Sequence, residues 1–228
     1  MAKTITTPTP AAPAAKSRVF IVDDHAMFRE GLRQLIERDP EFAVCGDAAD
    51  ADEALRAIRE TRPDVVLVDI SLAGASGIDL IKALKAEADD PPILVVSMHD
   101  ELLYAERALR AGAMGYVMKH EPAKTVKAAI RKVLGGDLWL SEKMTNSVVA
   151  KFARGQPSAA AASPVEILSD RELEVFRLLG KGKGVREIAE LLGVTVATVN
   201  TFRNRIKDKL QLKSSTEVML HAIQWSRE

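Results

Sequence analysis

The sequence predicts a doubly wound α/β domain with a five-stranded parallel sheet, followed by a small all-α domain of four helices. Between residues 18 and 134, five apolar runs alternate with five helical patterns, and such alternation is typical of βαβ units. Because crossovers between parallel strands are right-handed, the first domain is restricted to a doubly wound sheet. After residue 168 only short helical patterns separated by glycines remain, which predicts the second domain.

The predicted strands cover residues 18–23, 42–46, 64–69, 93–97 and 115–118. The central run is apolar between its two terminal aspartates, as expected of a strand buried on both faces of the sheet. Cys45 lies in the second run and is expected to be an unreactive core residue. As the only cysteine it cannot form an internal disulfide, which suits a reducing compartment.

The predicted helices of the first domain cover residues 26–38, 51–61, 77–87, 101–111 and 122–134. Gly112 and the pair Gly135-Gly136 are expected to end two of them. A further amphipathic stretch, 141–153, precedes a segment framed by prolines that is expected to be a linker. The helices predicted beyond it cover residues 170–180, 185–192, 196–210 and 214–226.

These patterns divide the chain into four parts. The predicted parts are a disordered tail (1–16), the α/β domain (17–136), a connecting helix and linker (137–167), and the helical domain (168–228). Basic and acidic residues both number 32, so any nucleic-acid surface has to be local. No apolar run approaches the roughly 18 residues of a membrane span, and the tail has no apolar signal core. We therefore expect a cytoplasmic protein without membrane contact.

Charged residues follow three of the predicted strands where each strand ends. Asp23 and Asp24 follow the first, Asp69 ends the third, and Lys119 follows the fifth. The carboxyl ends of parallel strands meet at one edge of the sheet, where ligands bind in open α/β folds. Clustered carboxylates repel each other unless a cation joins them, and an all-oxygen site with open positions suits Mg²⁺. The group predicts a site for attack by a carboxylate on phosphorus, with Asp69 as the nucleophile and Mg²⁺ and Lys119 neutralising charge.

Two hydroxyl side chains are expected beside this site. Ser97 ends the fourth strand and can donate a hydrogen bond to a phosphoryl oxygen, and Tyr116 precedes Lys119 on the fifth. Any one of these residues alone is more often a turn, cap or surface residue, so the prediction depends on their convergence. The four histidines lie in separate segments without ligand spacing, which argues against a histidine metal site. His25 is expected to orient the acidic pair or to begin the first helix.

Residues 18–135 resemble a CheY-like receiver domain of a two-component response regulator. The matching segments are Ile21-Val22-Asp23-Asp24-His25, Val68-Asp69-Ile70-Ser71-Leu72 with Gly77, Ser97, and Gly115-Tyr116-Val117-Met118-Lys119. Ala73 departs from the family, which usually has proline in the loop after the acceptor. The departure removes a rigid ring but no chemical group.

The resemblance implies a role for each residue of the site. Asp69 would accept a phosphoryl group from a sensor histidine kinase, Ser97 and Tyr116 would be the switch pair, and Lys119 would contact the phosphate. The implied ligands of Mg²⁺ are Asp23, Asp24, Asp69 and the backbone carbonyl of Ser71. Phosphorylation would then shift an existing equilibrium and release the helical domain or promote dimerisation.

The second domain has the pattern of a helix-turn-helix. Ser169 and Glu172 form a predicted capping box at its first helix. Two later helices are separated by a short turn at Gly193, and the second can enter a major groove. A buried stripe is predicted at Ile188, Leu192, Val199, Ile206 and Leu210. The opposite face is locally basic and is expected to contact double-stranded DNA through Thr195, Thr198, Asn200, Thr201, Arg203, Asn204, Arg205, Lys207 and Lys209.

Residues 168–225 resemble a LuxR-type helix-turn-helix, and the two motif sets together are similar to the NarL/FixJ subfamily of response regulators. The signature lies in Leu168 to Val175, Leu178-Leu179, Gly182, Glu187-Ile188-Ala189, Leu192, Thr198-Val199 and Ile206 to Leu210. The departures lie on the DNA-contacting face: Asn200 and Phe202 replace the common Lys and His, and Ser215 replaces a frequent Arg. Each lost phosphate contact flattens the salt dependence of binding by roughly 0.9 in slope. The last helix carries Val218, Leu220, Ile223 and Trp225 among few charges. Part of this set is expected in the core and the remainder in a dimer seam, as the resemblance implies, so a symmetric dimer is expected.

The sequence therefore predicts a phosphorylation-controlled transcription regulator, not an enzyme beyond its own aspartyl phosphorylation and dephosphorylation. Two alternatives stay open at this point. One is a phospho-regulated protein-interaction module whose helical domain has weakened DNA binding, for which Asn200, Phe202 and Ser215 argue. The other is a haloacid-dehalogenase-like phosphotransferase, which has a second aspartate where this chain has Ser71.

Overall fold

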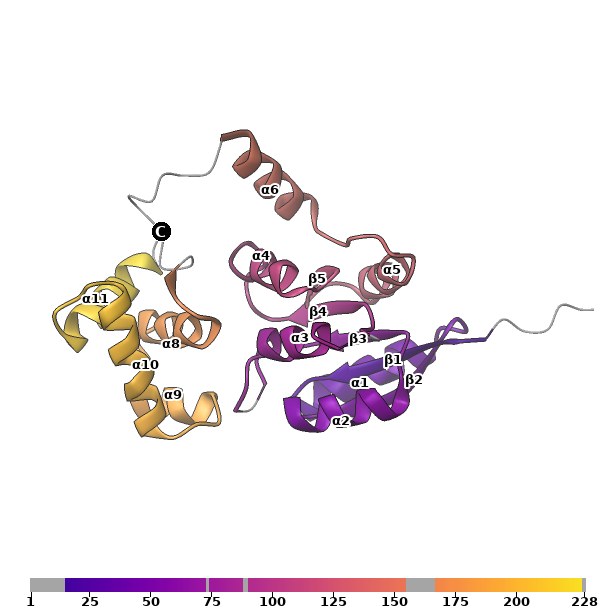
Figure 1. Cartoon of the computed structure of the whole chain (residues 1–228), viewed down its shortest axis with the longest axis horizontal. Helices are drawn as coiled ribbons and strands as arrows, with labels where there is room; N and C mark the ends of the chain where they lie inside the picture. The colour runs from indigo at the N-terminus through magenta and orange to yellow at the C-terminus, as the bar shows by residue number, and fades with distance from the viewer. Residues whose placement is uncertain (1–14, 73, 88–89, 155–166, 227–228) are drawn as a thin grey trace, which may run out of the picture.

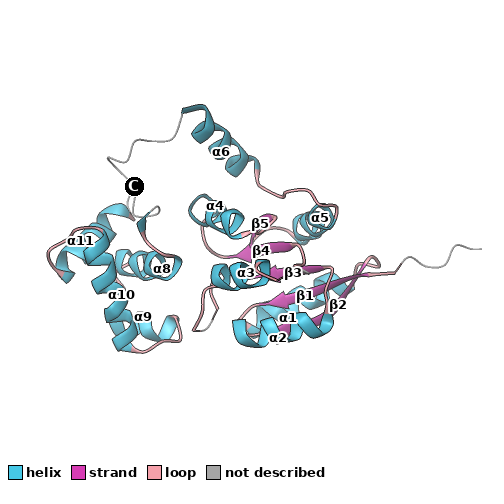
Figure 2. Cartoon of the chain, viewed as in Figure 1, coloured by secondary structure: helices cyan, strands magenta, loops and turns pink. Residues whose placement is uncertain are grey.

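The computed structural model describes residues 15–72, 74–87, 90–154 and 167–226. Almost all of the predicted tail, residue 73 and most of the predicted linker lie outside the described residues. Two domains are present in the described part, an α/β domain and a helical domain (Figures 1 and 2). One further helix follows the α/β domain in the chain.

The sheet of the first domain is five-stranded and parallel, in the order β2-β1-β3-β4-β5. Its strands are β1 Ser17–Val22, β2 Phe42–Ala48, β3 Val65–Val68, β4 Ile93–Ser97 and β5 Gly115–Met118. The predicted fold class is confirmed, and every predicted strand is present within two residues of its expected ends. The order reverses between β1 and β3, where neighbouring crossovers pass to opposite faces, so a crevice opens at the carboxyl ends of these two strands.

Helices cover both faces of the sheet. They are α1 Ala26–Glu37, α2 Ala51–Thr61, α3 Gly77–Lys85, α4 Glu101–Ala111 and α5 Ala123–Leu134. Apolar residues of α1 and α5, among them Ile36 and Ile130, pack on one face. Residues of α2, α3 and α4 pack on the other, as Ile58, Ile81 and Ala105 show. Gly112 ends α4 with φ 110°, a left-handed conformation that glycine adopts without strain, as predicted.

The segment after α5 is bonded back onto the sheet before the next helix begins. Trp139 makes a parallel bridge with Gly115 of β5, and its carbonyl accepts a hydrogen bond from the N–H of Tyr116 at 3.1 Å. The helix α6 Glu142–Arg154 follows. Glu101 of α4 accepts hydrogen bonds from the backbone and hydroxyl of Ser141, so the start of α6 is tied to α4.

The second domain consists of α8 Asp170–Gly180, α9 Val185–Leu191, α10 Val196–Lys209 and α11 Ser215–Trp225. The predicted capping box is present: Ser169 Oγ accepts from the N–H of Glu172, whose carboxylate accepts from the N–H of Ser169. Val199 and Ile206 are fully buried between α8 and α9, and Ile188 faces them. No helix in the described ranges is long and apolar enough to cross a membrane.

Helix α8 of the second domain lies against α3 and α4 of the first (Figure 1). Asp170, the first residue of α8, accepts a hydrogen bond from Arg107 of α4 at 2.6 Å and lies 3.4 Å from the ammonium of Lys82 of α3. The loop after β3 also contacts the second domain, where the N–H of Gly74 donates to the carbonyl of Leu192. The two domains are therefore in direct contact at the edge where the strands of the sheet end.

Candidate phosphorylation site and DNA-contacting surface

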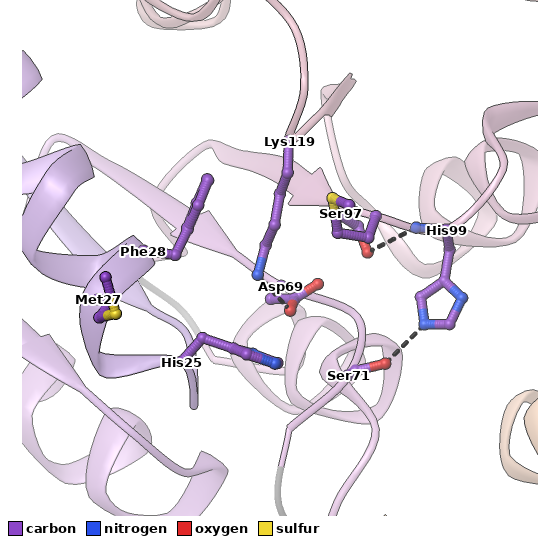
Figure 3. A pocket seen from close by; sticks show the side chains of 9 residues that line it. His25, Met27, Phe28, Asp69, Ser71, Ser97, His99 and Lys119 are labelled. Atoms are coloured by element: carbon purple, nitrogen blue, oxygen red, sulfur yellow. Dashed lines mark hydrogen bonds and ion pairs between the residues drawn. The ribbon is translucent and has the colours of Figure 1, made fainter. Parts of the chain in front are cut away.

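A pocket of about 390 Å³ opens at the carboxyl ends of β1, β3, β4 and β5. Its lining residues are His25, Met27, Phe28, Asp69, Ser71, Ser97, Met98, His99 and Lys119. Figure 3 shows Asp69 and Lys119 between His25 and Phe28 on one side and Ser71 and His99 on the other. The structure thus brings together residues that the sequence placed at the ends of separate strands.

Lys119 joins two carboxylates of the pocket. Its Nζ lies 2.5 Å from Asp23 Oδ2 and donates a hydrogen bond of 2.7 Å to Asp69 Oδ2. All three side chains are at most 4% exposed, so the ammonium compensates charge where water does not. The ring of Phe28 lies 4.4 Å below the same ammonium and adds a cation–π contact.

The remaining acidic groups suit a hard divalent cation. Ligand atoms of Asp23, Asp24, His25 and Asp69 lie within 4.8 Å of one another. The buried Asp69 Oδ1 has no hydrogen-bond partner in the described structure. Asp24 Oδ1 has none either: His25 Nδ1 lies 2.7 Å from it, but the contact does not have the geometry of a hydrogen bond. Oxygen atoms left unpaired in a cluster of carboxylates match the preference of Mg²⁺, so these residues fit such a cation.

His25 fulfils both expectations for it. It is the residue before α1, and its N–H donates to Asp23 Oδ1 at 2.8 Å. This bond orients the first carboxylate, while the imidazole of His25 stays 67% exposed beside the second. The exposed ring is therefore a neighbour of the acidic pair on the outer side of the pocket.

The position of Asp69 depends on a close approach by Gly77. The N–H of Gly77 donates to the carbonyl of Ile70 at 2.7 Å, which folds the loop after β3 back on itself. A Cβ on Gly77 would lie 1.9 Å from the carbonyl oxygen of Asp69, so only glycine fits there. Ser76 Oγ then caps α3 by accepting from the N–H of Ile78.

The two hydroxyl residues expected beside the site both bond to the backbone of His99. Ser97 Oγ, fully buried at the end of β4, accepts from the N–H of His99 at 3.4 Å. Tyr116 is 1% exposed, and its hydroxyl donates to the carbonyl of His99 at 2.8 Å. Burial raises the pKa of Tyr116 well above its usual range, so this hydroxyl stays protonated and remains a donor.

The side chain of His99 connects the pocket to the second domain. Its Nε2 lies 2.6 Å from Ser71 Oγ, and its Nδ1 bonds with Nη1 of Arg177 of α8. The ring also packs against that of Tyr104 in a tilted arrangement, at a centroid distance of 4.6 Å. Burial, together with the guanidinium of Arg177, lowers the pKa of His99 to about 4, so the imidazole is neutral.

Helix α8 supplies two further side chains to this contact. Glu174 accepts a hydrogen bond of 2.8 Å from Ser71 Oγ through one carboxylate oxygen, and from Arg171 at 2.7 Å through the other. Arg171 also donates to the carbonyls of Leu72 and Ala75 in the loop after β3. Sequence reasoning missed His99, Arg171, Glu174 and Arg177. The charged residues of α8 are three apart in the sequence, but the same spacing is typical of a solvated helix face.

The predicted DNA-contacting side chains lie on α10 and at its start. Six are exposed: Thr195, Asn200, Thr201, Asn204, Arg205 and Lys209; Thr198, Arg203 and Lys207 are half-buried. The contact between the domains therefore involves α8 and leaves most of this surface open. Phe202 is half-buried and packs against the core of the second domain, which accounts for an aromatic residue on this helix.

Several members of this surface already make hydrogen bonds or ion pairs within the domain. Lys209 lies 2.6 Å from the buried carboxylate of Glu172 on α8. Thr195 Oγ1 accepts from the N–H of Thr198 and so caps α10. Asn200 accepts a hydrogen bond from Arg203 at 3.2 Å. In contrast, no ion pair or hydrogen bond is recorded for the side chains of Asn204 and Arg205, although both are described and exposed.

Comparison with protein families assigns both parts of the chain. Residues 19–131 match the response regulator receiver domain, and residues 166–222 match the bacterial regulatory proteins of the luxR family. A curated relative, the oxygen regulatory protein NreC of Staphylococcus carnosus (strain TM300), is 37% identical over 209 residues. That alignment covers 90% of this chain and 96% of the relative, so the similarity extends through both domains.

Solved structures show the same architecture. A LuxR-family two-component response regulator from Aurantimonas sp. SI85-9A1 has 37% identity and a TM-score of 0.57, over 61% of this chain and 99% of its own. The response regulator ChrA of a heme-sensing two-component system has 29% identity and a TM-score of 0.50, over 93% and 98%. RcsB from Salmonella enterica serovar Typhimurium, solved on a promoter with the phosphomimetic BeF₃⁻, shares the fold at 22% identity, with a TM-score of 0.59 over 91% and 98%.

Proposed function

The chain belongs to the two-component response regulators of the NarL/FixJ subfamily, with a receiver domain and a LuxR-type DNA-binding domain, and we propose that Asp69 is its phosphoacceptor. The chain is thus a phosphorylation-controlled transcription regulator, and such regulators are transcription factors, not classical enzymes. The comparisons support neither the interaction-module alternative nor the phosphotransferase alternative. The observation that carries the proposal is the unpaired, buried Asp69 Oδ1 that lines the pocket.

The chemistry follows from the surroundings of this carboxylate. Asp69 Oδ1 accepts no hydrogen bond from the part of the chain that the structure describes, and it is the oxygen that would attack phosphorus. Lys119, bonded to the other oxygen of Asp69, holds the carboxylate in place and compensates the charge of the product. Ser97 lines the same pocket and can donate its hydroxyl to a phosphoryl oxygen. The phosphoryl donor would be a sensor histidine kinase, and the same pocket would admit the water that removes the group.

Mg²⁺ would be held by Asp23, Asp24, Asp69 and the backbone carbonyl of Ser71. When bound, the cation would supply positive charge to the phosphoryl oxygens. Asp23 and Asp69 both form an ion pair with Lys119, so their carboxylates are close enough to bind one cation together. The exposed residues Met27 and Met98 at the mouth of the pocket leave it accessible to a donor.

The signal would pass from Asp69 through Ser97 and Tyr116 to the contact with α8. We place the boundaries of the parts at residues 16/17, 136/137 and 167/168. Release of the second domain would allow two copies to bind a duplex with two half-sites, in which Leu220 of α11, 60% exposed, would lie in the dimer seam. Because its target would be DNA, the proposed location of the protein is the cytoplasm.

The test combines phosphorylation with selection of DNA. The full chain is incubated with acetyl phosphate and Mg²⁺, and incorporation is followed by phosphate-affinity electrophoresis, for the wild type and Asp69→Asn. Random duplex DNA is then selected with and without beryllofluoride. We expect incorporation only in the wild type and enrichment of an inverted repeat that is stronger with beryllofluoride. Incorporation into Asp69→Asn would refute the assignment of Asp69.

A further inference from the structure

His99 is the residue on which the switch pair and the DNA-binding domain meet. Its backbone N–H and carbonyl bond to Ser97 and Tyr116, respectively. Its imidazole bonds to Ser71 of the pocket and to Arg177 of α8. No other residue in the described ranges joins both members of the switch pair to the second domain by hydrogen bonds.

The direction of these hydrogen bonds can be assigned from the donors available. Arg177 can only donate, so Nδ1 of His99 accepts and the ring proton is on Nε2. Nε2–H therefore donates to Ser71 Oγ, whose own hydroxyl donates to Glu174. The chain of bonds starts and ends on α8, because Arg177 and Glu174 are three residues apart on one face of that helix. We call this group of Arg177, His99, Ser71 and Glu174 the clasp.

The clasp is partly shielded from solvent: Glu174 is buried, and Ser71, His99 and Arg177 are half-buried. His99 is 16% exposed and Glu174 is 8% exposed in their side chains. Arg177 also lies over the ring of Tyr104, with 5.4 Å between the guanidinium carbon and the ring centre. Bonds between charged and neutral groups in such surroundings are stronger than those at the surface.

The clasp restrains the residues that have to rearrange around a phosphoryl group. Ser97 and Asp69 line the same pocket from neighbouring strands, and Ser97 is two residues from His99. A movement of Ser97 towards a group on Asp69 would strain its hydrogen bond with the N–H of His99, whose imidazole is held by Ser71 and Arg177. The docked α8 therefore opposes the arrangement that a phosphorylated pocket requires.

We propose that Arg177, on the DNA-binding domain, is a positioning residue of the phosphorylation site that acts through His99. Held by Arg177, the imidazole keeps Ser97, Tyr116 and Ser71 in the unphosphorylated arrangement. By reciprocity of linkage, whatever weakens the clasp strengthens the binding of a phosphoryl mimic. This inference rests on the proposed function of Asp69 and adds to it that the second domain tunes the chemistry of the first.

The experiment measures beryllofluoride affinity in the full chain by ¹⁹F NMR with Mg²⁺. Arg177→Met keeps the length of the side chain but removes its donors, and Arg177→Lys keeps a charged donor. Arg186→Met, on the exposed start of α9, is the matched control. We expect Arg177→Met to tighten beryllofluoride binding about tenfold, within the usual range of coupling between two sites. The beryllofluoride affinity of Arg177→Lys is expected to lie between those of Arg177→Met and the wild type. The affinity of the control should match that of the wild type.

A double-mutant cycle separates the clasp from a general loosening of the protein. His99→Phe keeps a ring to stack on Tyr104 but cannot accept from Arg177. In the His99→Phe background, Arg177→Met should have no further effect on beryllofluoride affinity, because the bond it removes is already gone. The rate of phosphorylation by acetyl phosphate, measured on the same four proteins, should follow the same pattern.

The outcomes distinguish this inference from the proposed function. Unchanged beryllofluoride affinity in Arg177→Met, in a protein whose wild type binds the mimic, overturns the inference. Additive effects of the two substitutions also overturn it, because they would act separately. A wild type that neither binds beryllofluoride nor incorporates phosphate refutes the proposed function instead.

Discussion

The ammonium of Lys119 lies 2.7 Å from one carboxylate oxygen of Asp69, while the other oxygen of the same carboxylate has no hydrogen-bond partner among the described residues. One atom of the group is thus anchored and the other is available. Lys119 also reaches Asp23 at 2.5 Å, so a single side chain compensates two buried acids from neighbouring strands. The stability of the pocket in the absence of metal should depend on this lysine.

Lys119→Met is expected to destabilise the metal-free protein by about 3 kcal/mol, because it leaves buried carboxylates without a counter-charge. Mg²⁺ should restore a large part of the loss, since it brings two positive charges to the same oxygens. Thermal unfolding in EDTA and in Mg²⁺ measures both effects. Lys124→Met, at an exposed position of α5, is the control and should change neither value. Equal unfolding temperatures of the Lys119 variant and the wild type in EDTA would contradict the role of the ion pair.

Gly77→Ala is expected to displace the backbone of Asp69, because the added Cβ meets its carbonyl oxygen at 1.9 Å. We expect a loss of roughly 1–3 kcal/mol in the free energy of unfolding, typical of overpacking, and slower incorporation from acetyl phosphate. Gly31→Ala is the matched control: it lies within α1 with no atom near its added Cβ. It should stabilise by about 0.5–1 kcal/mol, as alanine does in helices. Normal phosphorylation of Gly77→Ala would show that the loop tolerates the shift.

The ion pair between Glu172 and Lys209 predicts a dependence of stability on acid. Burial acts to raise the pKa of Glu172, but hydrogen bonds from Lys209 and from the N–H of Ser169 outweigh it, and the net pKa is lowered. A lowered pKa gives stability that is complete above the unfolded value of 4.5 and is lost as pH falls through the folded value. Lys209→Met should make the loss of stability below pH 4.5 less steep. It should also lower the free energy of unfolding at neutral pH by about 1 kcal/mol, a modest value because solvent weakens a half-exposed ion pair.

Circular dichroism of thermal unfolding between pH 3 and 7 tests this expectation. Lys213→Met serves as the control, because it removes an exposed lysine of the same domain whose side chain makes no ion pair within the described ranges. A steeper acid decline in Lys209→Met than in wild type would be the opposite of what the lowered pKa requires.

The exposed surface of α10 predicts two different effects on DNA binding. Arg205→Ala should weaken binding to all sequences and reduce the slope of log K against log salt by roughly 0.9, as expected for one lost phosphate contact. Asn204→Ala should instead relax the preference for one base pair, at a cost of about 1–3 kcal/mol on the selected site alone. Fluorescence anisotropy at several salt concentrations, on selected and scrambled duplexes, separates the two. A salt slope unchanged by Arg205→Ala would remove this residue from the phosphate-contacting set.

The sequence allowed the receiver's pocket to be predicted because its residues share one simple property: each follows an apolar strand. Asp23, Asp69 and Lys119 are fixed by strand ends, and parallel strands end at the same edge. The capping box at Ser169 was equally predictable, since its partners are three residues apart. Local spacing is sufficient for such features.

The clasp could not be predicted in this way. Ser71 and Glu174 are 103 residues apart, and His99 and Arg177 are 78 apart. Such contacts arise from the docking of two domains, for which no local period exists. A polar helix face such as that of α8 is usually solvated, and only the docked arrangement shows that Arg171 and Glu174 are buried.

The bonding of Trp139 to β5, and of Ser141 to α4, has a consequence for how strongly α8 has to bind. The chain leaves the receiver from a fixed position, so α8 docks as part of the same molecule and at a high effective concentration. For short tethers this concentration is in the mM range. A contact with a dissociation constant of about 1 mM, barely detectable between separate molecules, would then be about half formed within one chain. A phosphoryl group therefore has to supply only a modest free energy to separate the two domains.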